Sequence, residues 1–336
     1  MKIQHNISLK QYNTFGIDVN AERFIEINSV IELKSLLKKE KDLFIISGGS
    51  NMLLLSDIKT LVVFLNIEGI IIQETQENDV FVTANSGENW HDFVLWCIDQ
   101  NYGGLENLSL IPGNVGSCPI QNIGAYGVEV KDTIHQVTAI EINTGKTRVF
   151  SNQECDFGYR NSIFKNELKG KYIITTVAFK LTKSEHIIYD SYGAIRAVLD
   201  ENSITEPTIS DVSKAIVGIR ASKLPDPKQI GNSGSFFKNP VVKKIVFEQI
   251  QRNNPTMPFY KVNDDAFKIP AGWLIETCGF KGKRYGDAGV HKNQALVLVN
   301  FGNATGNEIY TLAQKIQTSV SETFGIPLEI EVNIVH

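Results

Sequence analysis

The stretch Leu43-Phe44-Ile45-Ile46-Ser47-Gly48-Gly49-Ser50-Asn51 decides how the first part of this chain is organised. An apolar run ends in two glycines flanked by serines, a pattern typical of a buried strand that turns sharply at its carboxyl end. Backbone N–H groups in such a turn can converge on an anion, and Ser and Asn side chains add neutral donors for phosphate oxygens. The spacing is neither G-x-G-x-x-G nor a Walker A loop. The glycine loop (residues 47–51) is therefore either a phosphate site of another geometry or a plain turn.

Strand and helix signals alternate on both sides of the glycine loop. Residues 24–27 and 61–65 read as strands, and Ser29-x-x-Glu32 is a capping box that opens an apolar helical stripe. The β-α-β order predicts a small α/β unit that ends near residue 68.

Two further regions follow along the chain. Two prolines in Lys223-Leu224-Pro225-Asp226-Pro227 end a helix, which places a boundary just before them. We therefore expect an α+β chain in three parts, 1–68, 69–221 and 222–336, in which the last strand can return to the first two parts. The further expected strands are 80–84, 137–142, 147–150, 172–181, 295–300 and 328–335, and the expected helices are 90–98, 212–220, 242–252, 271–277 and one around 309–320 that ends at Gly325.

Composition excludes several classes of protein. A chain of 336 residues with 42% hydrophobic residues can bury two or three cores, so it is not a disordered protein. The net charge of −4 argues against a nucleic-acid or anionic-membrane surface. The N-terminus lacks a signal-peptide h-region and the apolar runs are only strand-length, so we expect a cytoplasmic protein.

Metal and disulfide chemistry are not expected either. The four cysteines, Cys97, Cys118, Cys155 and Cys278, form no C-x-x-C pair, and the six histidines show no metal-ligand spacing.

The long loop (residues 110–127) is the second candidate site. Four glycines, two prolines and several amide or hydroxyl side chains predict no regular element there. Long ordered loops in compact domains are usually functional, and small residues let the backbone lie against a flat ligand and its pyrophosphate. The alternative is a loop packed for its own sake. Together, the glycine loop and the long loop could clamp a dinucleotide from two sides.

Arginine, glutamate and lysine side chains mark three later segments. Arg160 lies between aromatic and small polar residues, so it could bind a carboxylate bidentately, although a surface ion pair is the simpler interpretation. Lys223, Lys228 and Lys238 form a local basic cluster suited to a diphosphate or a carboxylate. Glu331 shares a strand face with Glu329, where carboxylates are usually solvated.

Ser235 follows Gly234 at a point where the chain can turn sharply. The segment is not G-x-S-x-G, because Phe237 occupies the last position, so a serine hydrolase is disfavoured. A serine without an adjacent base can still act as a proton donor when a cation holds its hydroxyl.

Taken together, nine segments in order resemble the UDP-N-acetylenolpyruvoylglucosamine reductase (MurB) family over nearly the whole chain. The segments are Tyr12-Asn13-Thr14-Phe15-Gly16, residues 47–51, Glu106-Asn107-Leu108 with 111–113, residues 119–127, Phe157-Gly158-Tyr159-Arg160, residues 223–227, residues 234–240, Ala271-Gly272-Trp273-Leu274-Ile275-Glu276 and His291-Lys292-Asn293-Gln294-Ala295-Leu296.

This resemblance implies a fold and a reaction. The fold would be a two-part FAD-binding domain of the vanillyl-alcohol oxidase type followed by a C-terminal α+β substrate-binding domain. The reaction would be the NADPH-dependent reduction of the enolpyruvyl ether of UDP-N-acetylglucosamine to UDP-N-acetylmuramate. This step of peptidoglycan synthesis serves cell wall biogenesis, cell shape and cell division. NADPH would react first and leave before the substrate enters, and the protein would be a monomer. The FAD would be bound non-covalently, because the glycine loop offers no histidine.

The resemblance also implies roles for single residues. Ser235 would donate the proton, Arg160 would stabilise the enolate, and Glu331 would lie beside it. Tyr192 matches a tyrosine that closes over the diphosphate in one of two family subtypes, and Lys223, Asn239 and Gln294 match other substrate-binding positions. The implied FAD-binding residues are Ser47, Gly48, Gly49, Ser50, Asn51, Pro112, Gly113, Gly116, Ser117, Ile123, Gly124 and Tyr126.

Three positions depart from the family pattern, and two other functions stay open. Asn114 and Cys118 stand where other small residues are expected, and Asn333 stands where some members carry Arg. The first alternative is another FAD-linked oxidase on the same scaffold. The second is a non-redox module that binds UDP-sugars.

Overall fold

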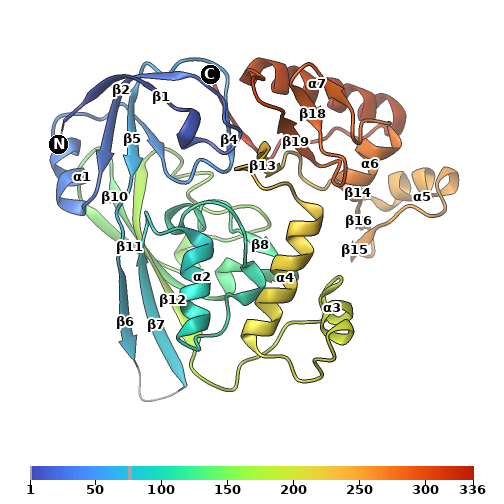
Figure 1. The fold of residues 1–336 in the computed structure, drawn as a ribbon, viewed down its shortest axis with the longest axis horizontal. Helices are drawn as coiled ribbons and strands as arrows, with labels where there is room; N and C mark the ends of the chain where they lie inside the picture. The colour runs from blue at the N-terminus through green and yellow to red at the C-terminus, as the bar shows by residue number, and fades with distance from the viewer. Residues whose placement is uncertain (1, 75–77) are drawn as a thin grey trace. The chain divides into compact units, whose positions relative to one another are not determined.

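The structure, a computed structural model, describes residues 2–74 and 78–336 and divides into two units (Figure 1). Unit 1 comprises Ala21–Gly48 and Lys59–Ser222 together with the N-terminal segment to Ile7. Unit 2 comprises Ser8–Asn20, Gly49–Ile58 and Lys223–His336. The division in three parts stays a prediction, because this grouping does not test a subdivision of unit 1.

A parallel sheet in unit 1 carries the first half of the glycine loop. Its order is β1-β2-β5-β3, in which β5 pairs in parallel with both neighbours. Helix α1 (Val30–Leu37) begins at Ser29, whose hydroxyl accepts the N–H of Glu32 as the capping box predicts. The strands are β1 (Gln4–Ser8), β2 (Asn20–Ile27), β3 (Leu43–Ile46) and β5 (Leu61–Leu65). Strand β3 thus delivers Ser47 and Gly48 at its carboxyl end, the edge of a parallel sheet where ligands usually bind.

An antiparallel sheet in unit 1 supports the long loop. Its order is β11-β10-β12-β7-β6. Helix α2 (Trp90–Asp99) packs Trp90 and Phe93 on Phe179 of the sheet, with ring centroids 6.0 and 5.2 Å away. The strands are β6 (Ile70–Glu74), β7 (Asp79–Asn85), β10 (Ile134–Glu141), β11 (Thr147–Ser151) and β12 (Tyr172–Thr182).

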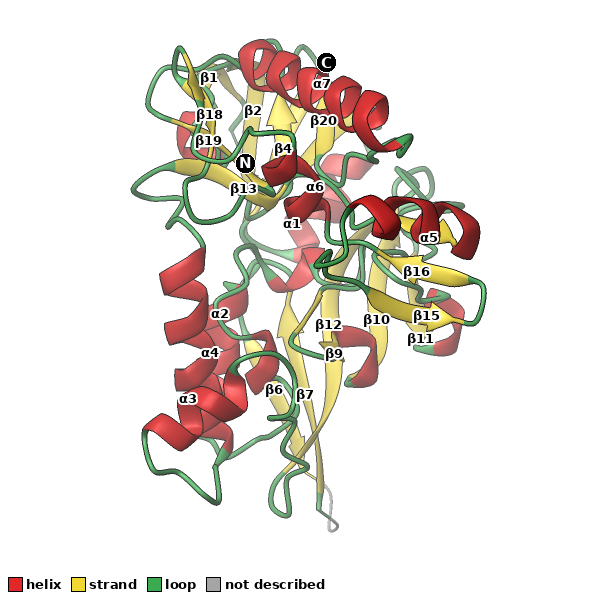
Figure 2. Cartoon of the chain, turned by 90° about the vertical axis from the view of Figure 1, so that its right-hand side faces the viewer, coloured by secondary structure: helices red, strands yellow, loops and turns green. Residues whose placement is uncertain are grey.

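Helices α3 (Ile195–Glu201) and α4 (Ile209–Lys223) complete unit 1, and α4 lies beside α2 in both ribbon views (Figures 1 and 2). Their shared core is formed by Ile195, Leu199, Val212, Ala215, Ile216 and Ile219. Short 3-10 turns connect the longer elements of unit 1, at Glu106–Leu108, Val115–Ser117, Val130–Asp132 and Gln153–Cys155.

Unit 2 contains three small sheets. Helix α7 (Gly306–Phe324) packs on β18, β19 and β4; it begins with a Thr305–Glu308 capping box and ends at Gly325 with φ +67° (Figure 2). The sheets are β13-β19-β18-β17, β14-β16-β15 and β20-β4. The elements are a 3-10 turn (Lys10–Tyr12), β4 (Met52–Leu54), β13 (Gly231–Ser235), β14 (Val241–Lys243), α5 (Lys244–Asn253), β15 (Tyr260–Asn263), β16 (Ala266–Lys268), α6 (Ala271–Thr277), β17 (Arg284–Tyr285), β18 (Ala288–Val290), β19 (Val297–Asn300) and β20 (Asn333–Val335).

Two predicted elements are corrected by long-range pairing. The helix expected at 242–252 begins only at Lys244, because residues 241–243 pair with β16 instead. The strand expected at 328–335 is interrupted: Ile330 forms an isolated bridge with Phe237, and only 333–335 form a strand, β20, with β4. The segment changes partners between these two pairings, which no local pattern predicts.

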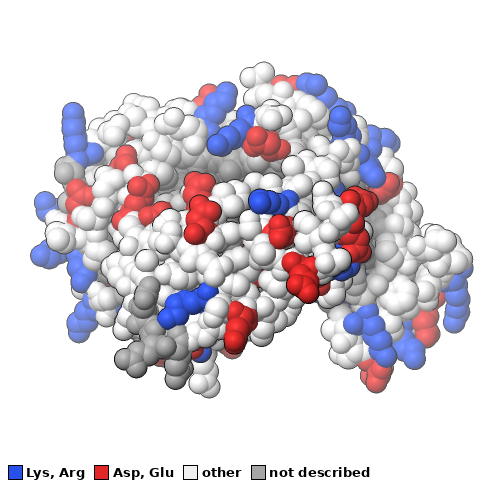
Figure 3. Space-filling model, turned by 60° about the horizontal axis from the view of Figure 1, so that its bottom comes forward, with Lys and Arg blue, Asp and Glu red and all other residues white. Residues whose placement is uncertain are grey.

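The charged side chains, the helices and the cysteines of the described residues agree with what the composition indicates. Lys or Arg and Asp or Glu groups are interspersed on the face seen in Figure 3, without a broad patch of one sign. Among residues 2–74 and 78–336, no helix combines the length and apolarity needed to cross a membrane. All four cysteines are free, and Cys97, Cys118 and Cys155 are buried.

Candidate active site

The first half of the glycine loop and the long loop lie against each other in unit 1. A Cβ atom built on Gly48 would lie 2.6 Å from Cα of Gly113 and 2.8 Å from Oδ1 of Asn114. Only glycine allows this approach, because real Cβ atoms do not tolerate such distances. The structure therefore brings together the two segments that the sequence marked as a possible clamp.

The first half of the long loop is shaped by the segment between β7 and α2. A Cβ atom on Gly116 would lie 2.5 Å from Cβ of Ser86, so these backbones are also in close contact. The backbone and amide bonds that join the segments are Val115 N to Glu88 O (2.9 Å), Gly116 N to Ser86 O (3.0 Å), Trp90 N to Gly113 O (3.0 Å) and Asn114 Nδ2 to Gly87 O (2.8 Å). Sequence reasoning missed this supporting segment, although its small Ser86-Gly87 pair at the end of a strand was a usable signal.

Buried hydroxyl groups at these loops fit a bound pyrophosphate. The Oγ atoms of Ser47 and Ser86 are buried and have no hydrogen-bond partner among the described residues. A buried hydroxyl without a partner is costly, whereas a phosphate oxygen would accept its hydrogen bond. The two serine hydroxyls and the close approach of the backbones at Gly48 therefore suit the pyrophosphate of FAD. They would bind it through neutral donors, without a lysine.

The second half of the long loop forms a small hairpin. Strands β8 (Gly124–Ala125) and β9 (Val128–Glu129) are joined by Tyr126 and Gly127, whose φ angles are +51° and +83°. Two consecutive positive φ angles are typical of the type I′ turns that fit two-residue hairpins. This turn explains Gly127 and leaves Tyr126 in a conformation unusual for an aromatic residue.

Cys118 and Ile123 precede this hairpin in the sequence. The backbone N–H of Ile123 donates to the carbonyl of Cys118 at 3.2 Å, and both side chains are buried. Burial raises the pKa of Cys118 well above its usual range, so the thiol stays protonated and is a poor nucleophile. The cysteine that departs from the family pattern is therefore packed as an apolar residue. Ser117 donates its hydroxyl to Asn114 O at 2.7 Å and so closes the turn before Cys118.

Arg160 is fastened to the long loop. Its Nη2 atom donates to the carbonyl of Gly124 at 2.8 Å, and its φ angle is +52°. Two more bonds join its segment to the same loop: Ser162 Oγ donates to Ile120 O at 2.6 Å, and Asn122 Nδ2 donates to Gly158 O at 3.0 Å. A left-handed arginine held by its surroundings is the kind of strain that clusters at functional sites.

Tyr126 lies near a second tyrosine, Tyr192, and a second arginine, Arg220. Its ring meets that of Tyr192 edge-on, with centroids 6.4 Å apart. Burial raises the pKa of Tyr126, while the nearby Arg220 guanidinium opposes the rise. Burial lowers the pKa of Arg220, and the positive charge of Arg160 acts in the same direction. Unit 1 therefore brings Arg160, Tyr126 and Tyr192 into one region, to which the structure adds Arg220.

Ser235 and Glu331 lie on adjacent segments of unit 2. The backbone N–H of Glu331 donates to the carbonyl of Phe236 at 2.9 Å, directly after Ser235. Phe236 and Phe237 are fully buried while Ser235 is exposed, so two aromatic anchors hold an accessible hydroxyl. Glu329, the other carboxylate of this segment, forms an ion pair with Lys238.

Asn239 and Gln294 each reach the start of α6. Oδ1 of Asn239 accepts the N–H of Ala271 at 2.9 Å, and a Cβ atom on Gly272 would lie 3.0 Å from Oε1 of Gln294. Two side chains that the resemblance assigned to the substrate are thus neighbours in the structure. Lys223 is the exposed last residue of α4.

The second half of the glycine loop is anchored within unit 2. A Cβ atom on Gly49, whose φ is +58°, would lie 2.0 Å from the carbonyl oxygen of Tyr12. The carbonyl of Asn51 accepts both the backbone N–H (3.2 Å) and the side-chain amide (2.8 Å) of Asn333. Asn333 therefore has a specific role here as a tie between the loop and β20.

Comparison with known proteins supports the same assignment. Residues 24–151 match the model of the FAD binding domain family, and residues 226–335 match that of the UDP-N-acetylenolpyruvoylglucosamine reductase C-terminal domain. A solved structure of UDP-N-acetylenolpyruvylglucosamine reductase from Thermus caldophilus superposes with a TM-score of 0.70 at 22% identity, covering 100% of each chain. The predicted α+β fold, an FAD-binding domain followed by a C-terminal domain, is confirmed.

Two relatives resemble the chain along its whole length. The UDP-N-acetylenolpyruvoylglucosamine reductase of Flavobacterium johnsoniae is 59% identical over 337 residues, which cover 100% of both chains. The protein of the same name from Pseudomonas syringae pv. syringae is 47% identical over 338 residues, 99% of each chain. With both domains matched in order and identity sustained from end to end, the chain belongs to the UDP-N-acetylenolpyruvoylglucosamine reductase family.

Proposed function

We propose that this protein is an FAD- and NADPH-dependent oxidoreductase that reduces the enolpyruvyl ether of UDP-N-acetylglucosamine to UDP-N-acetylmuramate. The observation that carries the proposal is the bond from Arg160 to Gly124, because it fixes an arginine, a side chain suited to a carboxylate, beside the loop predicted to hold the flavin. In the net reaction the double bond gains a hydride equivalent and a proton, and NADPH is oxidised to NADP⁺.

The glycine loop and the long loop hold the cofactor in this proposal. Ser47 and Ser86 offer hydroxyl groups to the pyrophosphate, and Gly48 and Gly113 let the two loop backbones approach each other. Hydrogen bonds to the segment between β7 and α2 hold the long loop in place. FAD bound there, without a covalent link, supplies hydride chemistry. The proposed FAD contacts remain those implied by the resemblance, with Ser86 added.

Arg160 binds the enolpyruvyl carboxylate. Negative charge grows on this group as the vinyl carbon is reduced, and a fixed guanidinium stabilises it without reorganising. The bonds of its segment to the long loop hold Arg160 in place before the substrate arrives. Glu331 is the second group that we assign to this carboxylate, with which it would share a proton.

Ser235 delivers the proton to the carbon next to the carboxylate. Its exposed hydroxyl is held by the buried Phe236 and Phe237, which restrict its movement. A hydroxyl is a weak acid, so it protonates only a strongly basic, carbanion-like carbon. Addition of hydride to the vinyl carbon gives the neighbouring carbon this character.

The uridine diphosphate portion contacts the remaining proposed residues. Asn239 and Gln294 at the start of α6 offer amide groups, and Lys223 offers a positive charge. Tyr192, which is 48% exposed and packed on Tyr126, closes over the diphosphate. We further propose that the protein acts as a cytoplasmic monomer in peptidoglycan synthesis, and so in cell wall biogenesis, cell shape and cell division.

Visible absorption tests the proposal directly. The purified protein is made anaerobic, NADPH is added, and the UDP-sugar enolpyruvyl ether follows. A yellow protein that bleaches and then recovers its colour has both half-reactions. Bleaching without recovery would retain the flavin but reject the substrate, and rapid reoxidation by oxygen alone would favour an oxidase. A colourless protein that takes up no FAD but binds UDP would replace the proposal with a non-redox binding module.

A further inference from the structure

Leu110 has an unusual backbone at the entrance to the long loop. Its φ angle is +58°, in the left-handed region that residues with a bulky side chain rarely adopt. Such a conformation costs free energy and persists only where the surroundings impose it. Leu110 directly precedes Ile111-Pro112-Gly113, so its conformation sets the direction in which the loop leaves.

Two side chains from distant parts of unit 1 hold Leu110 in this state. The N–H of Leu110 donates to Nδ1 of His91 at 3.0 Å, and its carbonyl accepts from Nε of Arg220 at 3.2 Å. His91 comes from α2 and Arg220 from α4, which is 110 residues away from Leu110 in sequence. Both polar backbone groups of the strained residue are thereby satisfied.

Arg220 also reaches the far end of the same loop. The Tyr126 phenol lies near enough to its guanidinium for the two groups to shift each other's pKa. Like Leu110, Tyr126 is a non-glycine residue with a positive φ angle, +51°. Its carbonyl accepts a hydrogen bond from Nδ2 of Asn107 at 3.2 Å. One planar, multi-donor group thus donates to the first end of the long loop and lies near the phenol at its far end.

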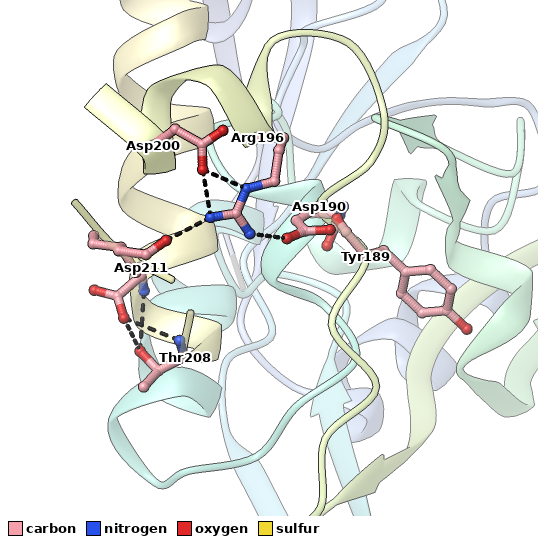
Figure 4. Close-up of polar contacts among 8 residues, drawn as sticks. Tyr189, Asp190, Arg196, Asp200, Thr208 and Asp211 are labelled. Atoms are coloured by element: carbon pink, nitrogen blue, oxygen red, sulfur yellow. Dashed lines mark hydrogen bonds and ion pairs between the residues drawn. The ribbon is translucent and has the colours of Figure 1, made fainter. Parts of the chain in front are cut away.

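The contrast with Arg196 shows what is special about Arg220. Arg196 on α3 has two carboxylate partners, Asp190 at 2.7 Å and Asp200 at 2.8 Å (Figure 4). Arg220 is partly buried and forms no ion pair with a carboxylate of the described residues; its neighbours are a carbonyl, a phenol and another arginine. A desolvated cation without a counter-ion is unfavourable, so stability alone does not account for it.

We propose that Arg220 is a positioning residue that holds the entrance of the long loop through its hydrogen bond to Leu110, and thereby sets the shape of the FAD site. This inference rests on the proposed function, since it assumes that the long loop binds FAD. Loss of the guanidinium would let Leu110 relax to a negative φ and redirect Pro112 and Gly113 away from Gly48. His91 is the second anchor of Leu110.

FAD binding to the full chain tests this role without relying on turnover. FAD is removed from the wild type and from Arg220→Met, Arg220→Lys and Arg196→Met, and its dissociation constant is measured by quenching of flavin fluorescence. We expect Arg220→Met to weaken FAD binding about tenfold or more, as the loss of hydrogen bonds from a charged donor predicts. Arg220→Lys should recover part of the affinity, because an ammonium can bind one loop end. Arg196→Met should bind FAD like the wild type, although it loses two ion pairs.

Each outcome separates the two claims. A wild-type protein that binds no FAD would refute the proposed function itself. A wild type that binds FAD and an Arg220→Met variant with equal affinity would refute the role of Arg220, as would equal weakening by Arg220→Met and Arg196→Met. If Arg220→Met does not fold, Arg220→Gln replaces it: we expect weaker FAD binding at an unchanged apoprotein melting temperature, and unchanged affinity would overturn the proposal.

Discussion

The buried side-chain amide of Asn122 donates a hydrogen bond to the carbonyl oxygen of Gly158 at 3.0 Å. The same amide donates to Glu129 at 3.0 Å, and its oxygen accepts the N–H of Lys131 at 3.1 Å. Asn122 belongs to the long loop, and Gly158 precedes Arg160 by two residues. The proposed flavin-binding loop and the proposed carboxylate-binding arginine are therefore held in one rigid network.

Asn122→Ala should impair turnover more than FAD binding. Removing the amide frees the Arg160 segment, so we expect kcat/KM for the enolpyruvyl substrate to fall about tenfold or more while FAD remains bound. Asn152→Ala is the matched control, because Asn152 also donates to two carbonyls of unit 1, those of Lys131 and Ile134. Equal losses of kcat/KM in both variants would show that general destabilisation, not the position of Arg160, causes the effect.

Gly48→Ala should prevent the two loops from approaching each other. The added methyl group would lie 2.6 Å from Cα of Gly113, and a backbone neighbour cannot move aside cheaply. We expect loss of FAD from the purified protein and a lower melting temperature. Gly218→Ala in α4 is the control: apart from its chain neighbours and the backbone of its own helix, no atom lies within 4 Å of the added Cβ, and alanine stabilises an exposed helix position by about 1 kcal/mol. Retention of FAD by Gly48→Ala would contradict the close-approach argument.

Ser235→Ala should separate the two half-reactions. Flavin reduction by NADPH needs no proton from Ser235, so its rate should stay near that of the wild type. Reoxidation by the enolpyruvyl substrate should slow by roughly 10²- to 10⁴-fold, as loss of a general acid predicts. Stopped-flow absorbance measures both rates, and Ser235→Thr, which keeps a hydroxyl, is the control. Equal slowing of both half-reactions would reject Ser235 as the proton donor.

Protonation of His91 should loosen the entrance of the long loop. Burial lowers the pKa of His91 below its usual 6.5, Asp92 opposes this shift, and Arg220 adds to it. The folded state thus binds the proton less readily than the unfolded state, so the stability from neutral His91 is present above about pH 6.5 and is lost as the pH falls toward the lowered folded-state pKa. The N–H of Leu110 also needs a neutral Nδ1 as its acceptor.

Urea unfolding between pH 5 and 7.5 measures this effect. His186 and His291 also have pKa values lowered mainly by burial, so they add a slope of the same sign in every variant. His91→Gln removes one of these titrations and should show a flatter dependence of unfolding free energy on pH than the wild type. Parallel curves for the two proteins would argue against a coupled His91.

Local sequence patterns predicted many helices and strands correctly, but they failed where pairing with a strand distant in sequence determines the structure. Strands β3 and β5 and helix α6 match their predicted ranges to the residue, because apolar runs and their flanking glycines and prolines are local signals. The Ser29–Glu32 capping box likewise indicated the start of α1, and Gly325 indicated the end of α7. Strand β14 was read as part of a helix, because its pairing with β16 lies outside any local window.

The sequence alone determined the family, the order of its segments and the glycines that the loops require, since motifs and residue size are properties of the chain. It also singled out Arg160, Ser235 and Glu331 as candidates. Only the tertiary structure decided which contacts hold the Arg160 segment, the long loop and the glycine loop in place: those of Asn122 with Gly158, of Arg220 with Leu110 and of Asn333 with Asn51. These contacts join residues 36, 110 and 282 positions apart. Hydrogen bonds over such separations depend on how the elements pack, and no periodicity of the chain encodes them.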